Sequence, residues 1–181
     1  MKSVLISIGP NWCELIVSGK KRIDIRKSSP KEAPFKAYIY CTKTKRRCSL
    51  CDYEGAYENS KVDIVYAQQQ IIGEFVCDII YDIDYLPKGY EGNPAMFSEF
   101  ICNNSCLSFE KIMKYKNGKS VYGWHISDLK IYDKPLKLSD FVKPCKYPFP
   151  CDECIYFEEL EERCDNIITH APRTWQYVEK R

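Results

Sequence analysis

The sequence lacks any apolar run of membrane-spanning length, and the short apolar run before Gly9 and Pro10 is too brief for the core of an export signal. We therefore expect a cytoplasmic protein without a membrane segment. Its eleven cysteines would then lie in a reducing compartment, where thiols stay free or bind metal instead of forming disulfides. The odd number of cysteines agrees with that expectation.

A strong net charge is also lacking, because the formal charge is +2 and the isoelectric point is about 7.9. The whole-chain charge therefore gives no sign of a nucleic-acid partner. Its distribution is uneven, however, since residues 1–47 hold 12 Lys and Arg against three acidic residues, a charge of +9, whereas the remainder carries −7. This asymmetry favours a phosphate-binding surface in the N-terminal part, although a solvated basic face explains it equally well.

Internal repeats are absent, and a length of 181 residues suits one domain with a sizeable core. Hydrophobic residues make up 45% of the chain and aromatic residues 14%. This composition argues against disorder over most of the length. We therefore expect a single domain over residues 1–181.

Periodicity predicts the elements of the first half of the chain. Residues 4–8 alternate as a buried strand, and residues 11–18 have helical spacing, with Gly19 in the place that ends a helix. Residues 21–27 alternate as a strand, and a buried strand is expected over 36–42. A long or bent strand is expected from Ile64 to Tyr85, with a bulge at Gly73.

The second half predicts two short helices, at 94–103 and 108–115, then strand character over 121–133 and a final strand near the C-terminus. We interpret 42–62 and 91–118 as insertions and 145–164 as a cysteine-rich segment. Strands outnumber helices and lack regular helical crossovers. The expected fold class is therefore α+β, a mixed beta-barrel with peripheral helices and a cysteine-bearing C-terminal excursion.

The segment from Gly19 to Arg26 reads GKKRIDIR and follows a strand, a proline and a short helix. It resembles the G-x-K-x-x-E-x-R signature of ASCH domains, which belong to the PUA-like superfamily. Asp24 stands where that family usually has Glu, which keeps the carboxylate but shortens its reach by a methylene. The resemblance extends loosely over residues 1–90 and 121–181, where stretches look like parts of uncharacterised bacterial and phage members.

This resemblance implies a small beta-barrel with a cleft that is lined by the signature residues and acts on RNA. Some members are amidohydrolases for acetylated cytidine and use a Lys, Thr and Glu constellation. Lys21 matches the Lys, but Asp24 occupies the Thr position, so the hydroxyl is missing here. Glu74, on a later strand, is the candidate for the remaining acid. If the chain is an enzyme, its candidate catalytic residues are therefore Lys21, Asp24 and Glu74.

The same segment supplies two candidate ligand-binding cations. Arg26 offers a planar fork of donors for a phosphate or a carboxylate, and Lys21 offers a point charge beside it. Alternatively, both cations only join strands by pairing with Asp24 and Glu74. Asp24, between the two cations, is expected to stay ionised and to orient its neighbours rather than act as a base.

Four further residues are candidates for base recognition, because an aromatic ring stacks on any base and histidine adds a hydrogen bond. They are Trp12, Tyr40, Trp124 and His125. Most aromatic residues belong to the core of a protein, so a buried Trp124 beside a satisfied His125 is an equally good interpretation.

Four cysteines close together follow the pattern C-x5-C-x2-C-x9-C, namely Cys145, Cys151, Cys154 and Cys164. Four thiolates on a short looped segment suit a tetrahedral zinc ion, which would be structural because no coordination position stays open for a substrate. A second pair, Cys48 and Cys51, allows an alternative site that joins the two C-x2-C pairs. Small buried thiols without metal are the remaining alternative.

These observations leave three functions open. The first is a binding module for RNA or a modified nucleobase, with a basic cleft and no turnover. The second is an enzyme, either a hydrolase of modified nucleosides or a ribonuclease. The third is a protein-interaction module in the acidic C-terminal half, for which the sequence has no positive sign.

Overall fold

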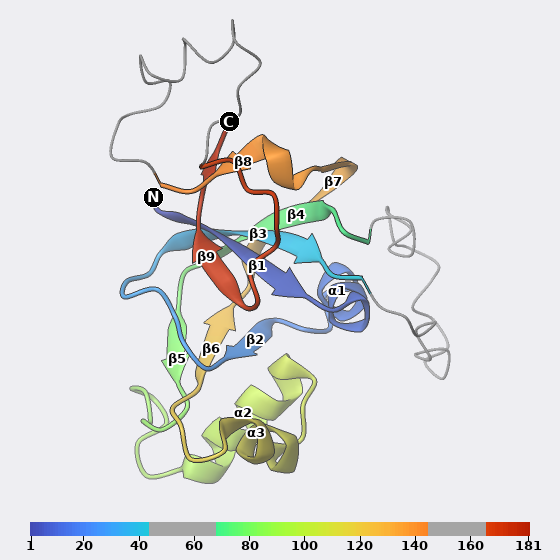
Figure 1. The fold of residues 1–181 in the computed structure, drawn as a ribbon. Coiled ribbons are helices and arrows are strands. Elements are labelled where there is room, and N and C mark those ends of the chain that lie inside the picture. The colour runs from blue at the N-terminus through green and yellow to red at the C-terminus, as the bar shows by residue number, and fades with distance from the viewer. Residues whose placement is uncertain (44–67, 145–165) are drawn as a thin grey trace, which may run out of the picture.

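The computed structural model describes residues 1–43, 68–144 and 166–181 (Figure 1). These residues form strands, three α-helices and one 3-10 helix. In chain order the elements are β1 (Ser3–Ile8), α1 (Pro10–Val17), β2 (Ile23–Arg26), β3 (Phe35–Cys41), β4 (Ile71–Cys77), β5 (Ile80–Asp82), α2 (Pro94–Ser105), α3 (Phe109–Lys116), β6 (Tyr122–His125), β7 (Ser127–Leu136), η1 (Leu138–Asp140), β8 (Phe141–Val142), β9 (Trp175–Tyr177) and β10 (Glu179–Lys180).

Five strands form the central sheet in the order β7-β4-β3-β1-β9. β1 and β3 pair in parallel, with Ser3 opposite Lys36 and Ile8 opposite Cys41. The other pairs of this sheet are antiparallel. Because alternate side chains of a strand point to opposite faces, the sheet separates two apolar clusters.

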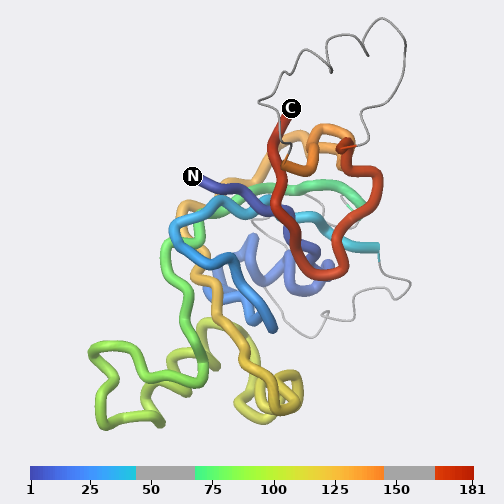
Figure 2. The backbone as a smooth tube through the Cα atoms, turned by 60° about the vertical axis from the view of Figure 1, so that its left-hand side comes forward, coloured from blue at the N-terminus to red at the C-terminus, as the bar shows by residue number. Residues whose placement is uncertain are grey.

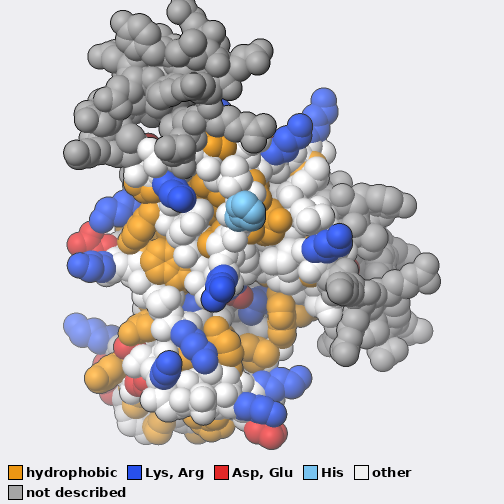
Figure 3. Space-filling view, in the orientation of Figure 1, with side chains coloured by type: hydrophobic (Ala, Val, Ile, Leu, Met, Phe, Trp, Pro, Cys, Tyr) orange, Lys and Arg blue, Asp and Glu red, His pale blue; other side chains and the backbone are white. Residues whose placement is uncertain are grey.

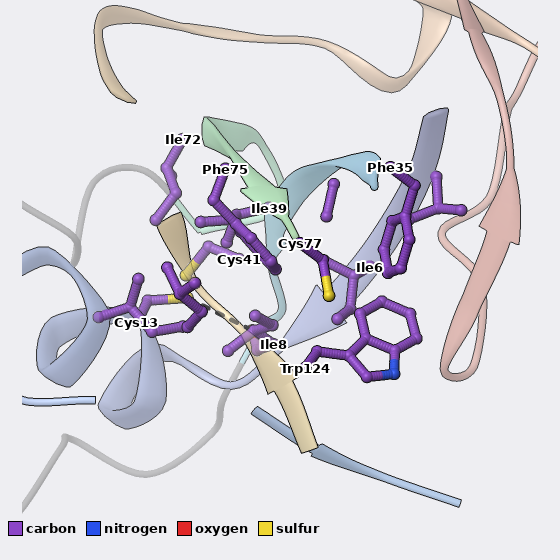
Figure 4. Packing of buried hydrophobic residues seen from close by; sticks show 14 residues of the cluster. Ile6, Ile8, Cys13, Phe35, Ile39, Cys41, Ile72, Phe75, Cys77 and Trp124 are labelled. Atoms are coloured by element: carbon purple, nitrogen blue, oxygen red, sulfur yellow. Dashed lines mark hydrogen bonds between the residues drawn. The ribbon is translucent and has the colours of Figure 1, made fainter. Parts of the chain in front are cut away.

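One cluster lies on the face of the sheet that α1 covers, and Figure 4 shows it from close by. It contains Phe75 from β4, Cys13 from α1 and the fully buried Trp124 from β6. The ring of Trp124 packs edge-to-face against Phe35, with 4.9 Å between centroids. Burial of these large side chains fixes α1 and β6 against the sheet.

The opposite face of the sheet is covered by the C-terminal part of the chain. β8 and β10 pair there as a two-stranded sheet (Figure 1). Phe141 of β8 packs edge-to-face on Tyr38 of β3, and Leu5 and Val178 complete the contact. Both faces of the central sheet are therefore apolar, which explains its nearly continuous hydrophobic strands.

β4–β5 and β6–β7 form one bent antiparallel ribbon. β4 pairs with β7 in the central sheet, whereas β5 pairs with β6 in a second, three-stranded sheet of order β2-β6-β5. The chain changes sheets at residues 78–79 and again between β6 and β7. The described part of the predicted long or bent strand is therefore bent, and Gly73 lies at a register shift in the β4–β7 pairing, as predicted.

α2 and α3 connect β5 to β6 and form a lobe beside the three-stranded sheet (Figures 1 and 2). The side chains of Asn93 and Ser108 cap the two helices by accepting hydrogen bonds from backbone N–H groups. Phe97, Ile101 and Ile112 pack the helices against β2. The two short helices predicted for this part of the sequence are confirmed.

The fold class is α+β, as predicted, but the pairings among the described strands do not close into a barrel. Closure fails there because β5 and β6 leave the central sheet and pair with β2 instead. The cysteine-bearing excursion at 145–164 lies outside the described residues, as does nearly all of the insertion at 42–62. In the described ranges, no helix is long and apolar enough to cross a membrane.

The bulge at Gly73 leads to a test of the sheet. A Cβ atom at this position would collide with the carbonyl oxygen of Lys130 and lie 3.2 Å from Cα of Ile131. We expect Gly73→Ala to lower the free energy of unfolding by about 1–3 kcal/mol in urea denaturation, because β7 must move. The control is Gly9→Ala, whose Cβ would meet only a ring atom of Trp12 at 3.7 Å. Equal stability of the two variants would contradict this account of the bulge.

Candidate functional site

The signature segment begins at a tight turn that ends α1. Gly19 has a φ of +72°, a left-handed conformation that glycine adopts without a steric cost. Its N–H donates to the carbonyl of Ile16, and the N–H of Lys21 donates to that of Leu15 at 2.8 Å. The turn therefore directs Lys21 back against α1, just before β2 begins.

Lys21 is buried, with 3% of its surface exposed, and its ammonium group has a full set of acceptors. Nζ lies 2.9 Å from the carbonyl oxygen of Ile23 and 3.0 Å from that of Ser105, at the end of α2. It also lies 3.3 Å from Oδ1 of Asp24. An ammonium carries three N–H donors, so each has a partner within the protein. Lys21 thus joins β2 to the carboxyl end of α2 and has no donor left for a ligand.

The carboxylate of Asp24 lies between two cations. Oδ1 faces Lys21, and Oδ2 accepts a hydrogen bond from Nε of Arg26 at 2.6 Å. Burial alone would raise the pKa of Asp24, but the charges and hydrogen bonds of Arg26 and Lys21 outweigh burial and hold this pKa below its ordinary value. Asp24 is therefore ionised at neutral pH, as predicted, and it orients both neighbours.

Arg26 differs from Lys21 because part of its guanidinium is unused. Nε donates to Asp24, and Nη2 donates to the carbonyl oxygen of Ser7 at 2.9 Å. A guanidinium carries five N–H donors, so among the described residues these bonds use only two of them. The side chain is 12% exposed and lines a pocket. Two N–H groups of the Arg26 guanidinium thus hold the side chain in place, and its remaining N–H groups are available to a ligand.

The pocket has a volume of about 280 Å³ and lies where β1, α1, β2 and α3 meet. Its charged and aromatic lining consists of Lys21, Arg26, Lys111, Asp24, Trp12 and Tyr115. Three cations thus face one carboxylate. Figure 3 shows Lys and Arg side chains gathered across the middle of the molecule, above the helical lobe. The pocket therefore suits a ligand with negative charge or hydrogen-bond acceptors.

Glu74 lies on the other face of the central sheet. It is opposite Tyr38 in the β3–β4 pairing, and its carboxylate accepts hydrogen bonds from Lys36 at 2.9 Å and from the hydroxyl of Tyr132 at 2.6 Å. Burial alone would raise the pKa of Glu74, but these hydrogen bonds hold it below its ordinary value. The structure thus does not bring Glu74 to the other two candidate catalytic residues.

Half of the candidate ligand-binding residues line the pocket, namely Trp12, Lys21 and Arg26. Tyr40 and Trp124 are buried in the two apolar clusters, on opposite faces of the sheet. Nδ1 of His125 lies 2.6 Å from Oδ1 of Asp78, away from the pocket lining. The surroundings of Tyr40, Trp124 and His125 therefore agree with the alternative interpretation, in which these side chains are structural.

No protein-family model and no curated protein matches this chain. Solved structures do match it. The crystal structure of ASCH from Zymomonas mobilis matches at a TM-score of 0.53 and 17% identity, over 99% of this chain and 89% of that chain. Two variants of the Zymomonas mobilis protein, a Tyr-to-Phe and a Ser-to-Ala change, match at TM-scores of 0.54 and 0.55 and 16% identity, over 99% of this chain and 92% and 89% of theirs. This chain has an ASCH-like fold.

The ASCH-like fold confirms the resemblance that the signature segment suggested, at the level of the fold. Identities of 16% and 17% carry no information on the ligand. The function must therefore be argued from the site itself.

Sequence reasoning missed the pocket residues in and just before α3, namely Lys111 and Tyr115 from the helix and Leu107, which precedes it. The signal for Lys111 and Tyr115 was present as a spacing of four residues, which places side chains on one side of a helix. A different side of this helix carries Ile112, which is buried in the helical lobe. The position of α3 beside β2 depends on tertiary packing that local periodicity does not reveal.

The predicted zinc ligands Cys145, Cys151, Cys154 and Cys164 lie outside the described residues, as do Cys48 and Cys51. In the parts of the chain that are described, no group of three or more His, Cys, Asp and Glu side chains could hold a metal ion. Structural zinc therefore stays a prediction.

The buried carboxylate of Asp24 makes stability depend on pH. We expect Asp24→Asn to lower the free energy of unfolding by about 3 kcal/mol or more at neutral pH, because two cations lose their anion. The folded pKa of Asp24 is depressed, so its contribution is complete above the unfolded pKa of about 3.9 and is lost as pH falls through the lower folded value. Urea denaturation over a pH series should show the difference from wild type shrinking in acid. A difference that does not change with pH would contradict this assignment.

Zinc content tests the cysteine prediction. Protein purified without chelator should contain about one zinc per chain by mass spectrometry, and Cys154→Ser should lower that content. The control is Cys106→Ser, whose thiol donates a hydrogen bond to the carbonyl of Lys20. Wild-type protein that contains no zinc would contradict the prediction of a structural zinc site.

Proposed function

We propose that this protein binds RNA or a modified nucleobase in the pocket at Arg26. The observation that carries the proposal is the free part of the Arg26 guanidinium, which a carboxylate and a backbone carbonyl hold in a fixed orientation. Planar N–H donors of this kind match a phosphate or the acceptor edge of a base. Because the group is already oriented, little side-chain entropy is lost on binding.

The size of the pocket suits a small ligand, and an exposed aromatic ring in its lining suits a planar one. Its volume of about 280 Å³ is just below the range of about 300–1,000 Å³ for drug-sized ligands. Trp12 lies at its edge with 37% of its surface exposed, and its ring centroid is 5.0 Å from Nζ of Lys21. An exposed aromatic ring beside fixed donors is the combination that single-stranded nucleic-acid sites use.

A binding role has more support than turnover. Of the candidate catalytic residues, Lys21 has each N–H donor engaged within the protein, and Glu74 lies across the sheet from the pocket. Asp24 accepts from two cations and is oriented by them. The hydroxyl that the family's amidohydrolases carry at the position of Asp24 is absent. The function that the geometry supports best is therefore recognition of RNA or a nucleobase.

The test is RNA affinity of an Arg26 variant. We expect Arg26→Ala to weaken binding of a labelled mixed-sequence single-stranded RNA by about tenfold or more in fluorescence anisotropy, because charge-assisted hydrogen bonds contribute about 1.5–3 kcal/mol. Arg26→Lys keeps the charge without the planar fork and should be intermediate. The matched control is Arg181→Ala, an exposed arginine beyond β10.

Two results would contradict the proposal. One is unchanged RNA affinity in an Arg26→Ala protein that still has the wild-type circular dichroism spectrum. The other is conversion or cleavage of the RNA by wild-type protein, which would establish turnover and favour the enzyme instead.

A further inference from the structure

One wall of the pocket is a single side of α3. Lys111 and Tyr115 are four residues apart on α3 and both line the pocket, together with Leu107, which precedes the helix. Another side of the helix carries Ile112, which is buried in the core of the helical lobe. This packing fixes the helix, so its pocket-facing side chains have defined positions relative to β2.

The outer end of this wall combines an aromatic ring with a cation from another element. Tyr115 is 40% exposed, and Nζ of Lys27 lies 4.9 Å from its ring centroid. Lys27 directly follows Arg26 at the bend after β2, and it is not among the residues that line the pocket. Arg26 therefore lines the pocket while Lys27 lies outside it, beside Tyr115.

The two cations of this outer wall are not paired with a carboxylate in the described part of the chain. Lys27 and Lys111 are exposed, and neither forms an ion pair with any carboxylate of the described residues. By contrast, Lys116, on the other side of α3, is paired with Asp84. Lys27 and Lys111 therefore keep their charges available for phosphate groups.

We propose that Lys27, Lys111 and Tyr115, which we call the α3 rim, bind the nucleotide next to the one in the pocket. Tyr115 stacks on its base, and Lys27 and Lys111 pair with the flanking phosphates. The ligand is accordingly a single-stranded RNA chain and not a free nucleoside. This inference rests on the proposed function, because it needs a first nucleotide at Arg26.

The test compares two probes on the same variants: a mixed-sequence single-stranded RNA of about ten nucleotides, within the span that one binding fold covers, and the four 5′-mononucleotides. Tyr115→Ala should weaken RNA binding by about tenfold and mononucleotide binding by much less, whereas Tyr115→Phe should keep the RNA affinity. Lys27→Ala should reduce the slope of log K against log salt for the RNA by about 0.7.

Matched controls are available on other surfaces. Tyr85→Ala removes a tyrosine that is outside both the pocket and the rim, and Lys134→Ala removes an exposed lysine of β7. Both control variants should bind RNA like wild type. A salt slope that falls equally in Lys134→Ala and Lys27→Ala would show a general charge effect and overturn the rim.

The outcomes separate this inference from the function on which it rests. Suppose that Arg26→Ala binds neither the RNA nor the mononucleotides, while Tyr115→Ala and Lys27→Ala bind RNA like wild type. The proposed function of the pocket is then supported, and the proposal for the α3 rim is wrong. If wild type binds mononucleotides as tightly as the RNA, a free nucleotide is the ligand and the rim is again wrong. If wild type binds neither probe, both proposals fall.

Discussion

The buried arrangement of Lys21, Asp24 and Arg26 is the interaction on which the rest of the site depends. Removing three charged groups from water is costly, and the cost is offset only because each group has hydrogen-bond partners. Lys21 bonds to the end of α2, and Arg26 bonds to the end of β1. Asp24 bridges the two cations and thereby connects the helical lobe to the central sheet. The same carboxylate orients the guanidinium of Arg26.

This arrangement gives different roles to two cations that look equivalent in the sequence. The N–H donors of Lys21 are directed at two carbonyl oxygens and at Asp24, and its side chain is almost completely buried. Lys21 therefore contributes a positive charge and holds Asp24 in position. Arg26 has more donors than its internal partners use, so it can also reach a ligand. A lysine in its place would have fewer spare donors and no planar fork. The number of donors, rather than the charge, decides which residue can bind.

Much of the local structure could be predicted from the sequence, because alternation over 21–27 and helical spacing over 11–18 are local signals. The resemblance to ASCH domains was recognised from the segment between Gly19 and Arg26. The position of Glu74 could not be predicted in the same way, since its face depends on the bulge at Gly73 and on the register of β4 with its neighbours. The contribution of Tyr115 depends on how α3 packs against β2, which is likewise a tertiary property.

The most direct measurement is a crystal structure of the protein with a short single-stranded RNA. The account predicts an acceptor atom of the RNA within hydrogen-bond distance of the Arg26 guanidinium, an aromatic contact with Trp12 and no RNA atom bonded to Nζ of Lys21. It is contradicted if the RNA contacts Nζ of Lys21 directly, or if it binds to a surface that does not include Arg26.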